Sequence, residues 1–352
     1  MNVGRTHHTA TLLADGRVLV TGGDNSAGDM LDSVEVYDPQ ANTWTELASL
    51  PEPRSNHTAT LLLDGRVLIA GGGTTSAIGL PNGVTALDTA SLFDPEADSY
   101  EAVEMNAKRA DHRAVALIDG RVLIMGGATD MISEACTVIP NCTVGTALDS
   151  AELFDPETNT FTPTESMTSP RYSAVADRLQ DGRVIIASGV DSNTSVATAE
   201  IFDPARGTFS PTADMQYDRL YAAGAVLGSG GFLIAGGKKA DVSPMSHTEV
   251  YDPASDSWTK VGELAELRTG ARALTLQSGK VIHLGGYNQL EQTAVADIEI
   301  YDEASASWTL IGELVKKRLS FTATLLADGR VLACGGVTFS VPVKTCEISV
   351  SE

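Results

Sequence analysis

The chain has 352 residues and a formal net charge of −22 at neutral pH. So acidic a chain is not expected to bind nucleic acid, whose phosphates it would repel, nor to dock on anionic lipid. No apolar run reaches the length of about 18 residues that a membrane span needs, so no membrane insertion is predicted. The opening residues MNVGRTHH contain no apolar signal core, so no signal peptide is expected in the chain as given.

An internal repeat organises the sequence. Each unit begins at an arginine, and 17 residues later comes a small doublet that is Gly-Gly in six of the seven units. A repeat of about 50 residues with this content predicts a propeller, in which each unit buries its apolar face against its neighbours. The seven arginines are Arg5, Arg54, Arg109, Arg171, Arg219, Arg268 and Arg318.

The first unit shows the four strands that we expect in each repeat, here called a to d. Residues 8–13 predict strand a, and Asp15-Gly16 supplies the tight turn into strand b at residues 17–21. Strand c follows at residues 33–37 and is stopped by an Asp-Pro pair. Strand d contains Trp44.

The later units repeat this plan. Strand b is almost continuously apolar, which predicts burial on both of its faces. Strands c and d each carry one aromatic residue at a fixed place, and these rings are expected to pack as wedges between blades. The strand d aromatics are Trp44, Tyr100, Phe161, Phe209, Trp258 and Trp308.

The segment HTATLL, the turn and strand DGRVLV and the Gly22-Gly23 doublet closely resemble the a–b hairpin of bacterial kelch-repeat propellers. The resemblance covers essentially the whole chain. It implies an all-β, seven-bladed propeller with four antiparallel strands per blade and strand a innermost around a central channel. We expect one domain, 1–352, with blades near 1–50, 51–104, 105–166, 167–214, 215–263, 264–313 and 314–352.

The seventh unit departs from the pattern. Its strand c, residues 346–350, lacks the aromatic-aspartate ending, and the sequence stops at Glu352 before a strand d. Only four residues precede Arg5, whereas the strand d aromatic elsewhere lies nine or ten residues before the arginine. Blade seven is therefore predicted to have three strands. Met1 matches Met105 and its equivalents as a mid-repeat position, so we expect further sequence upstream.

The loops between strands b and c are the variable part of each unit. They are longest in blades two and three, at residues 73–89 and 128–149. They leave the ring on the same side as the d–a connections, and long insertions on one side of a repeat array mark its binding face. The residues that follow the arginines on this side mix amide, carboxylate, hydroxyl and aromatic groups. The predicted ligand-facing residues are His7, Asn56, Asp111, Tyr172, Ser173 and Tyr221.

The seven arginines allow two interpretations, which are compatible. An arginine at one register in every unit suits bonding of backbone carbonyls with its five donors. The same ring of charges could attract an anionic ligand, and on this view the channel mouth should be positive.

Three histidines share the slot three residues after the arginine, which could suggest a metal site. The three histidines are His8, His57 and His112. The same slot holds alanine or phenylalanine in the other four units, so a packing role is predicted.

An acidic loop follows the first Gly-Gly doublet and contains Asp24, Asn25, Asp29 and Asp32. It lacks EF-hand spacing, so these are interpreted as solvated turn residues.

Four cysteines occur as two local pairs, Cys136 with Cys142 and Cys334 with Cys346. The absence of a CxxC spacing argues against a metal site, and the local pairing favours two disulfides. This predicts an extracellular or periplasmic protein.

No complete catalytic set is visible, so the sequence predicts a non-enzymatic, monomeric binding module without a cofactor. Its partner, a protein or a saccharide, would bind the face that carries the b–c loops. The resemblance also implies two alternatives, because kelch propellers include a sialic-acid mutarotase and the copper domain of galactose oxidase. In a mutarotase-like enzyme His7 and Asp111 could serve as acid and base. The copper alternative lacks a cysteine on a neighbouring inner strand and the family's further domain.

Overall fold

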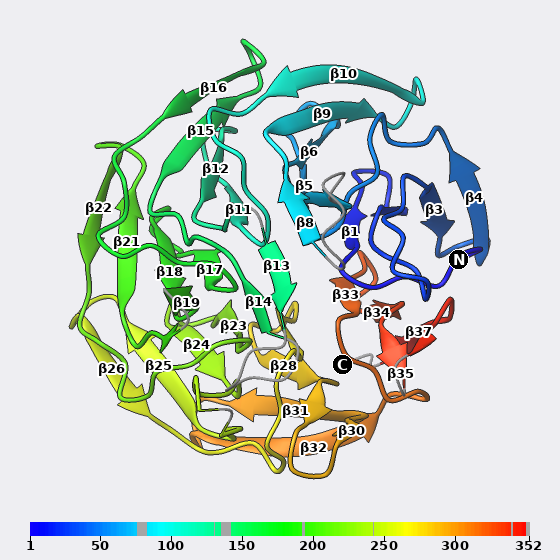
Figure 1. Ribbon diagram of the computed structural model, residues 1–352. Coiled ribbons are helices and arrows are strands. Elements are labelled where there is room, and N and C mark those ends of the chain that lie inside the picture. The colour runs from blue at the N-terminus through cyan, green and yellow to red at the C-terminus, as the bar shows by residue number, and fades with distance from the viewer. Residues whose placement is uncertain are drawn as a thin grey trace.

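The computed structural model describes residues 1–75, 83–129, 131–134, 142–191, 194–241, 243–338 and 341–349. Seven antiparallel sheets stand around a central channel, as Figure 1 shows. This is the seven-bladed propeller that the repeat predicted. No helix long and apolar enough to span a membrane occurs in the described part of the chain.

Each blade runs from an inner strand a to an outer strand d. Strands a are β1 (Thr9–Leu12), β5 (Thr58–Leu61), β11 (Arg113–Ala116), β17 (Val175–Arg178), β23 (Ala223–Val226), β27 (Arg272–Thr275) and β33 (Thr322–Leu325). Strands b are β2 (Val18–Thr21), β6 (Val67–Ala70), β12 (Val122–Met125), β18 (Val184–Ala187), β24 (Phe232–Ala235), β28 (Val281–Leu284) and β34 (Val331–Cys334).

The two outer positions complete the blades. Strands c are β3 (Val34–Asp38), β9 (Thr89–Asp94), β15 (Ala151–Asp155), β21 (Ala199–Asp203), β25 (Thr248–Asp252), β31 (Asp297–Asp302) and β37 (Cys346–Ser349). Strands d are β4 (Thr43–Leu47), β10 (Ser99–Glu104), β16 (Thr160–Pro163), β22 (Thr208–Pro211), β26 (Ser257–Lys260) and β32 (Ser307–Glu313). Within the described residues blade seven has three strands, as predicted.

The core lies between the blades. Every residue of the seven b strands is buried, which explains their continuous apolar sequence. The c and d aromatics of a blade pack on each other, with ring centroids 5.0 Å apart for Tyr37 and Trp44 and 5.2 Å apart for Tyr251 and Trp258. The predicted aromatic wedge is therefore a pair of rings packed at a tilt in each of the six four-stranded blades.

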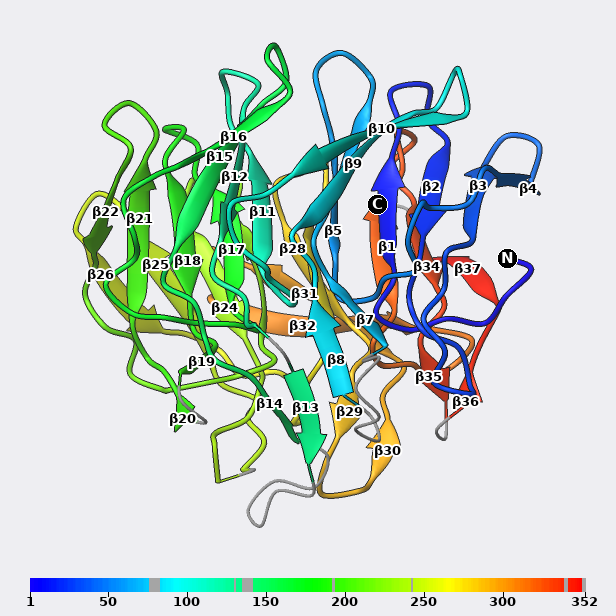
Figure 2. The same cartoon turned by 45° about the horizontal axis from the view of Figure 1, so that its top comes forward.

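The b–c connections contain short strands that the sequence analysis expected as loops. Figure 2 shows them projecting together from one side of the ring, which we call the loop face. The connections of blades two and three join in one sheet of order β14-β13-β8-β7, and three other connections form two-stranded hairpins. These strands are β7 (Gly73–Thr75), β8 (Gly83–Ala86), β13 (Met131–Glu134), β14 (Cys142–Val144), β19 (Val190–Asp191), β20 (Thr194–Ser195), β29 (Tyr287–Asn288), β30 (Thr293–Ala294), β35 (Val337–Thr338) and β36 (Val341–Pro342).

The small doublets mark the contact between neighbouring blades. The second glycine of the doublet donates its N–H to the carbonyl of the next blade's arginine, as Gly23 does to Arg54 at 2.8 Å. A Cβ at Gly22 would lie 2.4 Å from that carbonyl oxygen, so the close approach excludes a larger residue there. The same bond from Gly336 to Arg5, at 2.9 Å, closes the ring between blades seven and one.

Candidate functional site at the channel mouth

The repeated arginines are buried clamps that join strands a, b and c of their own blades. Arg5 donates to the carbonyl oxygens of Gly22 at 2.8 Å and Ser33 at 3.0 Å, and to Glu35 Oε1 at 2.8 Å. For six of the seven arginines, the offset of 17 residues seen in the sequence is such a hydrogen bond. The partner glutamates on strand c are Glu35, Glu152, Glu200, Glu249, Glu299 and Glu347.

In blade two the clamp arginine has a different carboxylate partner. Ser91 replaces the glutamate of strand c, and Arg54 instead lies 3.7 Å from Glu52. Thr89 Oγ1 accepts a hydrogen bond from Arg54 and donates one to Glu52, which connects the pair. Burial lowers the pKa of Arg54 and of the six other clamp arginines, and a nearby carboxylate raises it again.

The expectation that these seven charges make the channel mouth positive is therefore wrong. All seven guanidinium groups are fully buried and have a carboxylate within 3.7 Å. The carbonyl-bonding interpretation describes them, and their charge is used inside the blades. Arg5, Arg54, Arg109, Arg171, Arg219, Arg268 and Arg318 do not line the cavity at the mouth.

The residue two positions after each arginine forms what we call the mouth ring. All seven of these residues have a positive φ, and four neighbouring pairs are linked by backbone hydrogen bonds, such as Asn56 N to His7 O at 3.0 Å and Asp111 N to Asn56 O at 2.9 Å. All seven line one cavity of about 940 Å³. The members are His7, Asn56, Asp111, Ser173, Tyr221, Gly270 and Ser320.

The residue one position after each arginine lies in a different environment. It pairs through its backbone with the b–c loop of its own blade, as Thr6 does with Asp24 and Tyr172 with Val190. Tyr172 is only 3% exposed and packs in an apolar cluster with Leu220 and its neighbours. Burial raises the pKa of Tyr172 to about 12. Of the predicted ligand-facing residues, Tyr172 is therefore a core residue and does not line the cavity.

Two arginines that the sequence analysis missed line the cavity. Arg113 and Arg272 are the first residues of β11 and β27, four positions after a clamp arginine. The same slot holds threonine in three units and valine or alanine in the other two, and this irregularity was a signal available in the sequence.

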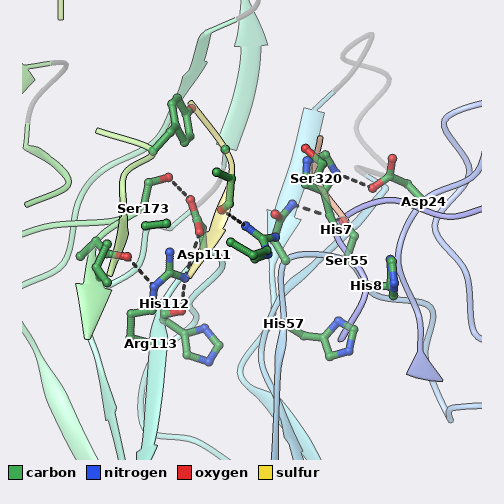
Figure 3. Close-up of a pocket in the computed structure, with 18 of the residues that line it drawn as sticks. His7, His8, Asp24, Ser55, His57, Asp111, His112, Arg113, Ser173 and Ser320 are labelled. Atoms are coloured by element: carbon green, nitrogen blue, oxygen red, sulfur yellow. Dashed lines mark hydrogen bonds and ion pairs between the residues drawn. The ribbon is translucent and has the colours of Figure 1, made fainter. Parts of the chain in front are cut away.

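Arg113 is held in a polar network at one side of the cavity. Its Nε donates to the carbonyl oxygen of Ala174 at 2.5 Å, and Nη1 lies 3.4 Å from Asp111 Oδ1. Ser173 Oγ donates to the other oxygen of Asp111. Figure 3 shows Asp111 between Ser173 and Arg113. Burial raises the pKa of Tyr221, and a hydrogen bond with Ser173 partly offsets this rise.

Arg272 has no such neutralising partner. Its guanidinium lies over the ring of Phe321, 5.9 Å from the centroid, and donates to the carbonyl oxygen of Ala271 at 3.2 Å. Among the described residues no carboxylate lies within ion-pair distance of it. Burial and the nearby Arg113 lower the pKa of Arg272 to about 10, although the charge of Asp111 partly offsets this, so the group is a cation at neutral pH.

His7 lies across the mouth in contact with the loop of blade one. Its Nδ1 is 2.8 Å from Asp24 Oδ1, and Thr6 Oγ1 donates to the other oxygen of Asp24 at 2.5 Å. His7 also lines the cavity, where its imidazole faces the space a ligand would occupy (Figure 3). Asn25 and Asp29 form a local turn, and the described residues contain no cluster of three or more possible metal ligands.

The slot three residues after the arginine is a contact between inner strands. His57 Nε2 forms hydrogen bonds with Thr21 and Thr9 of blade one, at 2.8 and 3.1 Å. His112 bonds Thr58 in the same way, and His8 bonds Thr322 across the ring closure. Burial lowers the pKa of all three imidazoles, that of His57 to about 3. These side chains are neutral packing groups.

Cys334 and Cys346 do not line the cavity at the mouth. Cys334 and Cys346 form a disulfide between β34 and β37. Cys136 lies outside the described residues, so the structure does not bear on its predicted bond with Cys142. The mouth residues do not fit a copper ion, because three histidines use Nε2 on threonines and Tyr172 packs in the core.

Comparisons with known proteins agree with this geometry. The Kelch motif family model matches residues 5–51 and 109–168. Alpha-scruin of Limulus polyphemus is 47% identical over 53 residues, which are 15% of this chain and 6% of scruin. Kelch-like protein 7 of Rattus norvegicus is 32% identical over 105 residues, or 30% of this chain and 16% of that protein. The matches thus span less than a fifth of these relatives.

Two solved structures resemble the fold at low sequence identity. YjhT is 16% identical with a TM-score of 0.65, covering 89% of this chain and 99% of that chain. A fungal alcohol oxidase of the AA5 family, in complex with copper, is 17% identical with a TM-score of 0.71. The match covers 95% of this chain and 70% of the oxidase chain. At this identity the likeness shows the fold alone. Together with the motif matches and the seven repeated blades, it identifies the chain as a kelch-repeat β-propeller.

Proposed function

We propose that this propeller is a binding module that takes an acidic saccharide in the cavity at its channel mouth. The observation that carries the proposal is Arg272, a cationic side chain that lines the cavity without a carboxylate partner among the described residues. In a chain of net charge −22, a guanidinium with no described carboxylate within ion-pair distance favours an anionic ligand.

The other lining groups suit a ligand with hydroxyls. Asn56, Asp111 and Ser320 offer donors and acceptors around the mouth ring, and Tyr221 exposes part of its ring to the cavity. An aromatic face packs against the C–H face of a sugar, while a carboxylate can accept two parallel bonds from Arg272. The volume of about 940 Å³ is within the range of small-molecule pockets.

A binding titration distinguishes recognition of the ligand's charge from recognition of its shape. Isothermal titration with galacturonate, its methyl ester and galactose should detect binding of galacturonate and a loss of about tenfold or more for the two neutral sugars. The Arg272→Met variant should lose the preference for the charged sugar. Arg206→Met, which removes an exposed arginine outside the cavity, is the matched control. Equal binding of all three sugars would contradict the proposal, and so would binding of none.

A second function, sugar conversion, is favoured by one observation. His7 is oriented by Asp24 on the loop of blade one, and Asp111 lies on the same mouth ring, so a base and an acid face one cavity. NMR exchange measurements on the anomers of a bound sugar would detect accelerated interconversion. The His7→Asn variant should abolish the acceleration while binding persists. A rate equal to that without protein would exclude this function.

The proposal includes a location outside the reducing cytosol. The Cys334–Cys346 disulfide persists in oxidising compartments such as the periplasm or the extracellular space. Thiol labelling of the freshly extracted protein tests this, because labelled Cys334 and Cys346 would indicate a reducing compartment.

A further inference from the structure

The cavity at the channel mouth is not walled equally on all sides. Among the described residues, the b–c loops that line it belong to blades one and two, through Met30 and Val84 among others. The mouth ring carries a side chain in every blade except blade six, where Gly270 stands between Tyr221 of blade five and Ser320 of blade seven. Side chains therefore cover the cavity least at blade six.

The backbone does not require a glycine at this position. The φ angle of Gly270 is 62°, and the other six members of the mouth ring are non-glycine residues at φ angles of 48–55°. A Cβ at Gly270 would meet nothing within 4 Å, so a side chain would have room there. Gly270 thus leaves open space two residues before Arg272 and next to Tyr221, whose carbonyl oxygen accepts a hydrogen bond from the Gly270 N–H at 2.9 Å.

A second cation lies on this side of the mouth. Lys238, in the b–c loop of blade five, has its Nζ 5.5 Å from the centroid of the Tyr221 ring. It is only 8% exposed, and no described carboxylate lies within ion-pair distance of its Nζ. Burial lowers the pKa of Lys238, so an anion that came near would stabilise its charged form.

The two cations occupy different places relative to the rim. Arg272 lines the cavity, whereas Lys238 does not and lies against Tyr221. Tyr221 is 38% exposed and offers an aromatic surface at the rim between blades five and six. A ligand with a single acidic group needs only Arg272. A ligand with acidic groups along a chain can use both cations, because the gap at Gly270 lets it extend out of the cavity.

We propose that the site binds a chain of acidic sugars, an oligouronate, rather than a single acidic sugar. One sugar places its carboxylate on Arg272, and the chain leaves the cavity over Gly270 with the next sugars against Tyr221 and a carboxylate toward Lys238. This inference rests on the proposed function, because it starts from an acidic sugar held by Arg272.

The ratio of two affinities tests the proposal. In calorimetric titrations we expect trigalacturonate to bind about tenfold or more tightly than galacturonate, because it meets a second cation and an aromatic surface. In Gly270→Asn this ratio should fall toward one, since a side chain would fill the space through which the chain leaves. The melting temperature should not fall, because Asn56 has the same backbone conformation in blade two. Gly207→Asn is the matched control, with a φ of 70° and open space outside the cavity, and it should keep the ratio of the parent protein.

Two adjacent lysines test the second cation. Lys238→Met should lower the ratio several-fold, because the carboxylate outside the cavity then has no cation to meet. Lys239→Met removes a lysine from the same loop that lies 3.9 Å from Asp218, and it should keep the ratio. Equal ratios in these two variants would contradict the role of Lys238.

The remaining outcomes separate this proposal from the proposed function. A trimer that binds no more tightly than galacturonate would overturn the proposal, while binding of galacturonate itself would still support the proposed function. A ratio that Gly270→Asn leaves unchanged would also overturn the proposal. Binding of neither sugar would overturn both. A tri-aspartate peptide that binds as tightly as trigalacturonate would make an acidic peptide, and not a sugar chain, the ligand.

Discussion

Arg268 and Arg272 lie four residues apart in blade six, but their charges are used differently. Arg268 is fully buried and bonds Glu299 at 2.5 Å, so its charge is satisfied within the blade. Arg272 lines the cavity, and no described carboxylate lies within ion-pair distance of it. The difference shows that the counterion, rather than the residue type, decides whether a buried charge stabilises the fold or remains available to a ligand.

The largest effect is expected at a clamp. Arg219→Met leaves Glu249 buried without its partner, and this should lower the free energy of unfolding by about 3–5 kcal/mol. Urea denaturation measures the loss. The double variant with Glu249→Leu should recover part of it, because the unpaired carboxylate is then removed as well. An effect no larger than that of Arg206→Met would show that the clamps do not stabilise the blades.

The two tyrosines near the mouth should behave differently from each other. Tyr172→Ala creates a cavity in an apolar cluster and should cost about 3 kcal/mol of stability. Tyr221→Ala, in the mouth ring, should leave the melting temperature nearly unchanged and weaken sugar binding instead. Calorimetric melting and the galacturonate titration distinguish them. If both variants lose stability equally, the mouth ring is part of the core.

The buried imidazoles should make stability fall in acid. Burial lowers the pKa of His57 to about 3, so between that value and its ordinary pKa near 6.5 only the unfolded chain takes up the proton. The contribution of His57 is complete above about pH 6.5 and is lost as the pH falls toward 3, by at most about 1.4 kcal/mol per pH unit. Urea unfolding at several pH values should show a shallower slope for His57→Phe.

The smallest effect is expected at Arg272. Removing a partly desolvated cation that has no carboxylate partner should stabilise the fold, by about 1 kcal/mol once solvent in the cavity is allowed for. Arg272→Met should therefore melt slightly higher than the parent protein while losing galacturonate. A lower melting temperature would place Arg272 with the clamps.

The sequence predicted the fold well because each repeat contains short local patterns that indicate its strands and turns. The Asp-Gly turns, the apolar b strands and the Gly-Gly doublets each follow from a requirement that recurs in every blade. The prediction of the site was partial. The residues one and two positions after each arginine were treated as one group, yet Tyr172 is in the core and Tyr221 faces the cavity. A positive φ at the second position separates the two, and Ser173 or Tyr221 gives no sign of it in sequence.

The sequence by itself determined the seven repeats, the three described strands of blade seven and the packing role of His8, His57 and His112. Their physical causes act within one repeat or between adjacent repeats, so each is visible in a local pattern. Only the tertiary structure decided which charges are neutralised and which face the channel. Closing the ring brings Arg113 of blade three and Arg272 of blade six to one cavity, and burial pairs each clamp arginine with a carboxylate of its own blade. Such pairing depends on distances that the spacing of residues along the chain does not contain.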